Sequence, residues 1–149
     1  MKTKTLIIVY GREGAGKSAS VIEIYKKLSG KEPEMRNLHD MKPDWVEFPD
    51  GDKIGFASEG DPRSRQKSDI QSLIDAGCNI IICACRANII INSTKAVQTV
   101  KNIYGLAEAN GYETIWTHHY ELRSTSRYHT EEDLNVVFAD AMIDLIHRL

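Results

Sequence analysis

The residue types that could do chemistry lie close together in one short run near the beginning of the chain. The run is Gly11-Arg12-Glu13-Gly14-Ala15-Gly16-Lys17-Ser18. Its glycines allow backbone N–H groups to turn inward around an anion, because no Cβ atom obstructs them. Lys17 adds a point charge suited to phosphate oxygens, and the hydroxyl of Ser18 can ligate Mg²⁺. The residues match the pattern G-x-x-x-x-G-K-S/T in full and predict a phosphate-binding loop.

Such a loop needs a strand before it and a helix after it, and the sequence supplies both. The continuous, β-branched run 5–10 predicts a strand that is buried on both faces. After the loop, residues recur at the spacing of one helix face: Ala19, Ile22, Tyr25 and Leu28. Ser29-Gly30 predicts the end of this helix. The positive N-terminal end of the helix would add to the attraction for an anion.

In this context the chain resembles the P-loop NTPase superfamily, and residues 11–18 are similar to its Walker A motif. The resemblance implies that these residues, together with Ala19, bind a nucleoside triphosphate. It also implies that Lys17 stabilises charge between the β- and γ-phosphates and that Ser18 binds Mg²⁺. The alternative is a glycine-rich turn between a strand and a helix that binds no ligand.

A working NTPase also needs a carboxylate near Mg²⁺, usually at the end of a neighbouring strand. The apolar run 78–85 is followed by Arg86, whereas the run 53–58 is followed at once by Glu59 and Asp61. By resemblance, this second strand end is a degenerate Walker B position, because glycine and alanine interrupt the strand and a serine precedes the acid. We expect Asp61, or failing that Glu59, to orient a metal-bound or attacking water.

Both acids also have structural interpretations. Asp61 followed by Pro62 is typical of an N-cap with proline at the first helical position, so a helix is expected to start there. The capping and metal roles are compatible, since a carboxylate has two oxygens. Glu59 is alternatively a solvated turn residue.

Arginines near the predicted strand ends are candidates for sensing phosphate. Arg86 follows a predicted central strand, at the edge where open α/β sheets bind ligands, and is our first choice; a surface salt bridge is the alternative. Arg63 and Arg65 flank the presumed metal strand. Arg123 and Arg127 lie in a polar segment that would form either an arginine-bearing lid or a solvated loop.

The histidines and cysteines do not predict a structural metal site. His118 and His119 are adjacent in the predicted strand 112–120 and so point to opposite faces, even though His129 is near in sequence. The three cysteines, Cys78, Cys83 and Cys85, lack a zinc-binding spacing. We interpret them as buried free thiols of a reducing compartment, which predicts a cytoplasmic protein.

The order of the expected elements defines a fold class. Two short β-rich runs within 45–58 surround a Pro-Asp-Gly turn and predict a hairpin. The apolar runs 78–85 and 112–120 alternate with amphipathic helical segments, the last of which follows Thr130 and Asp133. We therefore expect a single α/β domain over 1–149. It would be a three-layer sandwich with a mainly parallel sheet of about five strands and helices on both faces.

The composition of the chain limits the kinds of molecule that the protein is expected to bind. With 149 residues, 42% hydrophobic and 27% charged, the chain is typical of a soluble globular domain. A formal net charge of −2 argues against nucleic acid as a partner. No apolar stretch approaches the length of a membrane span, and the run 6–10 passes into glycines without the features of a signal peptide.

The nucleotide is expected to be ATP. The guanine-binding element N/T-K-x-D has only Thr94-Lys95-Ala96-Val97 as its nearest match, which lacks the aspartate. We rank a Mg-dependent ATPase first, with a protein partner or a homo-oligomer as a source of an arginine. The second hypothesis is a small-molecule or nucleotide kinase, in which segments 31–44 and 121–130 would surround an acceptor. A nucleotide-binding regulatory module without hydrolysis is the third.

Overall fold

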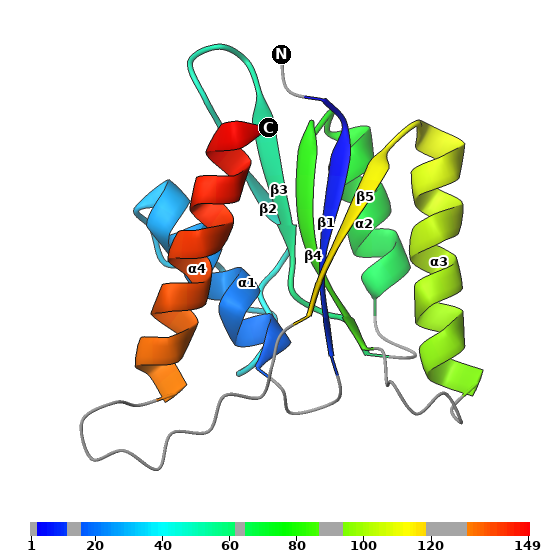
Figure 1. Ribbon diagram of the computed structural model, residues 1–149, viewed down its shortest axis with the longest axis horizontal. Helices are drawn as coiled ribbons and strands as arrows, with labels where there is room; N and C mark the ends of the chain where they lie inside the picture. The colour runs from blue at the N-terminus through cyan, green and yellow to red at the C-terminus, as the bar shows by residue number, and fades with distance from the viewer. Residues whose placement is uncertain (1–2, 12–15, 62–64, 87–93, 119–130) are drawn as a thin grey trace.

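The computed structural model describes residues 3–11, 16–61, 65–86, 94–118 and 131–149, with the backbone alone for 94–97 and 131–135. Within these ranges the chain contains five strands and four helices (Figure 1). The strands are β1 (Thr5–Gly11), β2 (Asp44–Glu47), β3 (Lys53–Ala57), β4 (Ile80–Arg86) and β5 (Glu113–His118). The helices are α1 (Lys17–Ser29), α2 (Gln66–Asp75), α3 (Thr94–Asn110) and α4 (Glu131–Arg148).

The strands form one sheet in the order β2-β3-β4-β1-β5. Four neighbouring strands, β3, β4, β1 and β5, are parallel, and β2 pairs antiparallel with β3 as the expected hairpin. Parallel strands all end at the same edge of a sheet. The segments that follow β1, β3 and β4 therefore leave the sheet together, with β4 between the other two.

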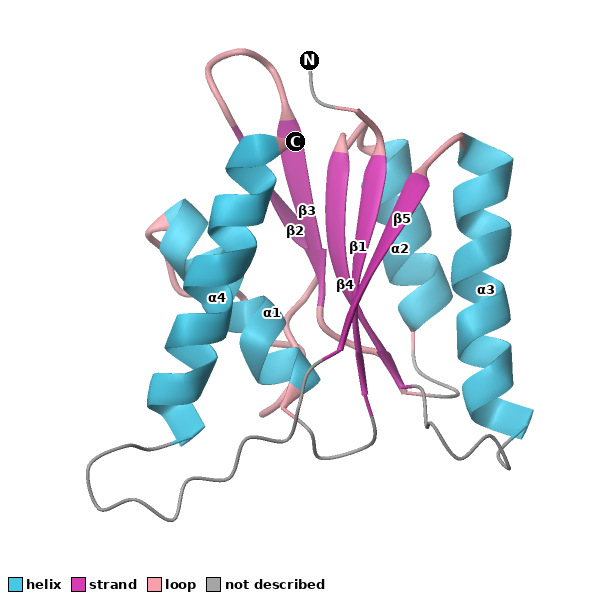
Figure 2. Cartoon of the chain, in the orientation of Figure 1, coloured by secondary structure: helices cyan, strands magenta, loops and turns pink. Residues whose placement is uncertain are grey.

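Helices cover both faces of the sheet: α1 and α4 lie on one face, and α2 and α3 on the other (Figure 2). Side chains of β1 alternate between these faces, as the two-residue period of a strand requires. Leu6 and Ile8 belong to the core under α2 and α3, while Ile7 and Val9 belong to the core under α1 and α4. All four are fully buried. The expected α/β class, with a mainly parallel sheet between two helical layers, is confirmed.

Glycines follow two of the helices, and Gly30 ends α1 where the sequence predicts. Gly30 follows α1 with a φ of +68°, and its N–H donates to the carbonyl of Lys26 at 2.9 Å. Gly111 follows α3 with a φ of +73°. These left-handed conformations carry little cost for glycine, because it has no Cβ atom.

The polar segment 31–44, expected to be a loop, contains a fixed turn within 31–43, and its last residue, Asp44, instead begins β2. Met35 and Met41 form an isolated antiparallel bridge. Between them, the side-chain oxygen of Asn37 accepts hydrogen bonds from the backbone N–H groups of His39 and Asp40, at 2.8 and 3.0 Å. This Asx arrangement stabilises the turn locally. Among the helices of the described ranges, none is both long and apolar enough to cross a membrane.

Candidate functional site

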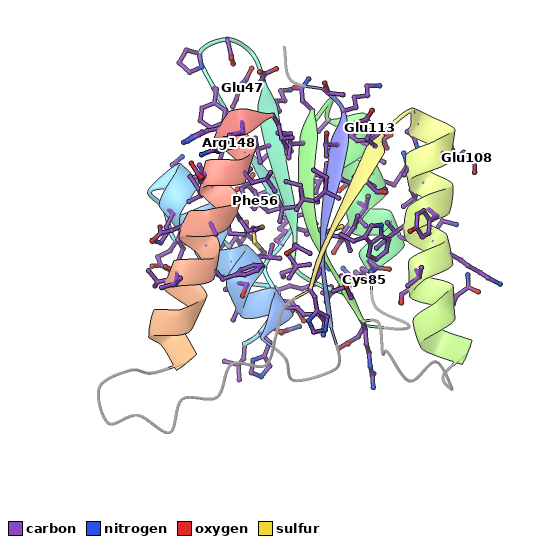
Figure 3. All side chains as sticks on the ribbon, viewed as in Figure 1. Glu47, Phe56, Cys85, Glu108, Glu113 and Arg148 are labelled. Atoms are coloured by element: carbon purple, nitrogen blue, oxygen red, sulfur yellow. The ribbon has the colours of Figure 1, made fainter. Side chains whose placement is uncertain are left out.

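The carboxyl edge of the sheet brings the predicted site residues together. Gly11 at the end of β1 pairs in register with Arg86 at the end of β4. Glu59 lies two residues after the end of β3. Figure 3 shows Cys85, which precedes Arg86, toward this edge and Glu113 toward the opposite one. Segments from β1, β3 and β4 can therefore act on one ligand.

Helix α1 begins at this edge. Its N-cap residue, Gly16, has a φ of +86°, in the left-handed region that favours glycine. Lys17 and Ser18 form the first turn with the exposed Ala19, and Lys17 is only 6% exposed. Within the described residues, no side chain caps the start of α1, and its first turn has no acidic residue. A helix start with a glycine at the N-cap and no acidic residue in its first turn, beside a buried lysine, is compatible with a bound anion.

The hydroxyl of Ser18 contacts the segment that follows β3. Its Oγ donates a hydrogen bond to the carbonyl oxygen of Ser58 at 2.7 Å. Because the proton is used in this bond, the lone pairs of Ser18 Oγ point away from Ser58, and a hydroxyl oxygen of this kind suits a cation such as Mg²⁺. The side chain of Ser58 is buried and accepts a hydrogen bond from the backbone N–H of Met41 at 2.9 Å. Ser58 thus ties α1 and the segment 31–43 to the end of β3.

Glu59 is fixed in place by two donors. Its Oε2 accepts from Arg36 Nη1 at 3.0 Å and from the backbone N–H of Arg65 at 3.1 Å. The side chain is 11% exposed. Both described donors share Oε2, so within the described part of the chain Oε1 is the oxygen open to a water molecule. The interpretation of Glu59 as a solvated turn residue is wrong, because the side chain is mostly buried and paired.

Arg36 joins Glu59 to a second carboxylate. Its guanidinium makes a two-point contact with Asp69, through Nη1 at 3.0 Å and Nη2 at 3.1 Å. This contact is the main cause that raises the pKa of Arg36 above its ordinary value, although partial burial opposes it. Arg36 is 22% exposed and Asp69 only 6%. Sequence reasoning missed both residues, which lie 33 positions apart and match no motif.

Gly60 allows the segment after β3 to lie against β4. A Cβ atom at this position would stand 2.6 Å from the backbone carbon of Ala84 and 2.8 Å from the backbone nitrogen of Cys85. The carbonyl of Gly60 accepts a hydrogen bond from the N–H of Arg86 at 2.8 Å. The glycine therefore keeps Glu59 beside the end of β4.

The helix expected to start at Asp61 starts instead at Gln66, with Arg65 as its N-cap residue and no side-chain cap. Asp61 is exposed and does not cap it. The physical reason is the contact of Gly60 with Arg86, which holds the chain along β4, so that the helical turns begin later. The Glu59 carboxylate then accepts from the N–H of Arg65, just before the first turn.

Arg86 lies where the sequence predicts, at the carboxyl end of a central strand. Its backbone is held on both sides: its N–H donates to Gly60, and its carbonyl accepts from Thr99 Oγ1 at 2.8 Å. Its side chain is partly exposed. Because Arg86 pairs in register with Gly11, its backbone lies beside the last residue before the segment that leads to α1.

The ring of His118 packs against the ring of Tyr10. It pairs in register with Tyr10, and the two ring centroids lie 5.0 Å apart. Among the described residues, no group of three or more His, Cys, Asp or Glu side chains could hold a metal ion. Several residues that the sequence singled out lie outside the described ranges: Arg12, Glu13, Gly14, Ala15, Pro62, Arg63, His119, Arg123, Arg127, His129 and Thr130.

The three cysteines are buried free thiols, as expected. Burial raises the pKa of Cys78 to about 11, opposed by the charge of Lys53. Burial also raises the pKa of Cys85, opposed by hydrogen bonds with Thr99 and Gln66 and by the charge of Lys17.

The fold and this edge define an α/β protein with an anion-compatible helix start at the carboxyl end of a parallel sheet. No family model, curated protein or solved structure matches the chain. Its function must therefore be argued from the chemistry of the site.

Proposed function

We propose that this chain is a P-loop NTPase that binds ATP with Mg²⁺ at residues 11–18 and hydrolyses the γ-phosphate. One observation carries the proposal. The start of α1, with the buried Lys17 and no acidic residue in its first turn, lies at the sheet edge where Glu59 and Arg86 are also held. A helix start with a buried lysine, an acid and an arginine thus come from α1, β3 and β4 to one edge, and this arrangement supports the proposal.

Each residue has a distinct role in this reaction. Lys17 stabilises the negative charge that develops on the phosphoryl group, and Arg86 senses the same group from the end of β4. Ser18 would hold Mg²⁺, with Asp61 acting on the metal or on a water bound to it. When bound, Mg²⁺ neutralises charge on the phosphate oxygens. Glu59, fixed through Oε2, orients the attacking water with Oε1.

Phosphate transfer to an acceptor other than water is the second candidate. One observation favours it: the segment 31–43 contacts the site at two points, through Arg36 to Glu59 and through Met41 to Ser58. A segment held there is placed to contact an acceptor. In that case Glu59 would orient the hydroxyl of the acceptor instead of water.

The deciding experiment measures phosphate release from Mg·ATP and Mg·GTP, together with the thermal shift that each nucleotide causes. The variant is Lys17→Ala, and the matched control is Lys27→Ala, which removes an exposed lysine of the same helix. We expect release from ATP by the wild type and by the control. Lys17→Ala should lower it at least about 100-fold, because the transition state loses a fixed charge.

The other outcomes separate the alternatives. A Lys17-dependent thermal shift without phosphate release would reject hydrolysis, and a screen of phosphate acceptors would then test for a kinase. If the protein transferred phosphate to none of these acceptors, the remaining interpretation would be a nucleotide-binding module without turnover. Unchanged ATP affinity in Lys17→Ala would contradict nucleotide binding at this site.

A further inference from the structure

We propose that Arg36 is the positioning residue for Glu59, and that Asp69 is its anchor. The inference rests on the proposed function and assigns this ion cluster to the same reaction. Arg36 does not need to touch the nucleotide. It would act by holding the carboxylate of Glu59 in the orientation from which Oε1 meets the attacking water.

The geometry of the contacts supports a positioning role. Arg36 Nη1 contacts Glu59 Oε2 and Asp69 Oδ2, both at 3.0 Å, while Nη2 contacts Asp69 Oδ1 at 3.1 Å. The planar guanidinium is thus fixed by Asp69 at two points before it reaches Glu59 at one. Asp69 lies in the first turn of α2, and its own N–H donates to the carbonyl of Arg65 at 2.8 Å.

The segment that carries Arg36 is itself well anchored. The N–H of Arg36 donates to the carbonyl of Asp40 at 2.8 Å, inside the turn that Asn37 stabilises. Met41, after this turn, donates to Ser58 Oγ, one residue before Glu59. The segment that carries Arg36 is therefore connected to the Glu59 segment twice. One connection is the ion pair of Arg36 with Glu59, and the other is the hydrogen bond of Met41 with Ser58. A catalytic group must be held within about 0.5 Å of its productive position, and these two connections restrict where the Glu59 carboxylate can lie.

The charges of the cluster also predict the effect of replacing Arg36 by lysine. Two carboxylates, 11% and 6% exposed, share one guanidinium. A lysine at position 36 would keep the charge but would be a point donor that cannot make the two-point contact with Asp69. Arg36→Lys should therefore support turnover only in part.

The test is a double-mutant cycle on steady-state ATP hydrolysis, with Arg36→Ala, Glu59→Gln and the double variant. We expect Arg36→Ala to lower kcat roughly 10- to 100-fold while KM for ATP changes less than about threefold, because Arg36 acts in the transition state through Glu59. In the Glu59→Gln background the same substitution should cost less than about twofold, since there is no carboxylate left to position.

Two further variants keep the test decisive if Arg36→Ala does not fold. Arg36→Lys and Asp69→Asn preserve most of the packing and should each give a kcat between those of the wild type and Glu59→Gln. Lys42→Ala is the matched control, because Lys42 is an exposed cation of the same segment. It should leave kcat and KM unchanged.

Three results would overturn the assignment. One is an equal loss from Arg36→Ala in both backgrounds, and another is a raised KM with unchanged kcat, which would place Arg36 on the nucleotide. The third is a normal kcat in Arg36→Ala and Asp69→Asn while Lys17→Ala is inactive; this rejects the role of Arg36 but keeps the proposed function. Absence of Lys17-dependent hydrolysis in the wild type would overturn both.

Discussion

The carboxylate of Glu59 joins parts of the site that are distant in sequence. A single oxygen, Oε2, accepts from the guanidinium of Arg36 and from the N–H of Arg65 just before α2. The first contact balances a charge, and the second satisfies a donor at the beginning of a helix. Glu59, and not Asp61, therefore contacts the backbone just before α2. Asp61, which is exposed, is left with the proposed role toward Mg²⁺.

The role of Asp61 can be tested at the scale of one residue. Asp61→Asn should raise the Mg²⁺ concentration needed for half-maximal ATP binding roughly tenfold, because a metal-directed carboxylate loses its charge. The melting temperature without nucleotide should not change, since Asp61 does not cap α2. Titrating Mg²⁺ at fixed ATP, with binding followed by fluorescence or calorimetry, measures the effect.

Asp144→Asn is a suitable control, because Asp144 is an exposed aspartate in α4 that pairs with Arg148, one turn further on. It should leave the Mg²⁺ dependence unchanged. If Asp61→Asn had the Mg²⁺ dependence of the wild type, Asp61 would have no role at the metal.

At the scale of elements, the close approach of the segment after β3 to strand β4 places the acid. Gly60 makes this approach possible, since its position is too near the backbone of Ala84 for a Cβ atom. The approach also brings Glu59 toward the end of β4 and so toward Arg86. Side-chain chemistry at this edge thus depends on a backbone contact between two elements.

Gly60→Ala should destabilise the protein by about 1–3 kcal/mol, the usual cost of forcing a methyl group into a packed site. The nearest atoms belong to the backbone of β4, which cannot move aside as a flexible side chain would. Because Glu59 would shift too, ATP hydrolysis should fall more than ATP binding. Urea unfolding and the activity assay measure the two effects.

Gly105→Ala is the matched control for this substitution. Gly105 is an exposed residue of α3, and a Cβ atom there would meet nothing within 4 Å. Alanine should stabilise the helix by up to about 1 kcal/mol. Equal stability of Gly60→Ala and the wild type would show that the close approach does not constrain this position.

At the scale of the whole molecule, two apolar cores hold the sheet between its helical layers. The core under α2 and α3 contains all three cysteines. Buried thiols favour the neutral form, so burial raises the pKa of each one above its ordinary value. The stability of this core is therefore linked to pH.

The sign of this linkage gives a prediction. The pKa of Cys78 is raised from 9.0 to about 11 in the folded protein, so the folded state keeps a proton that the unfolded state loses. Stability from this group is complete below pH 9 and decreases as the pH rises toward 11, in total by roughly 2–3 kcal/mol. The free energy of unfolding, from urea titrations between pH 8 and 11, should show this decrease.

Cys78→Ala isolates the contribution of Cys78. The variant should be less stable at pH 8, because a buried side chain is shortened, but its stability should fall less steeply above pH 9. The other two thiols, with Tyr25 and Tyr112, remain common to both proteins. Parallel pH profiles for the variant and the wild type would refute the contribution of Cys78.

Much of the architecture follows from local sequence patterns. The two-residue alternation and continuous burial of β1, the helical spacing of α1, and the glycines at 30 and 111 each depend on residues a few positions apart. Local propensity and hydrophobic period act over that range. For the same reason, the strand–loop–helix order around 11–18 could be predicted from the sequence, and with it the candidate phosphate loop.

Only the tertiary structure decided the order of the strands and the contacts that depend on it. The placement of β4 between β1 and β3, and the ion cluster of Arg36, Glu59 and Asp69, require residues separated by 23 and 33 positions to meet. No local sequence pattern predicts these long-range contacts, since they result from the packing of two helical layers on one sheet. The late start of α2 has the same origin, because a backbone contact with β4 prevailed over a good local capping signal at Asp61.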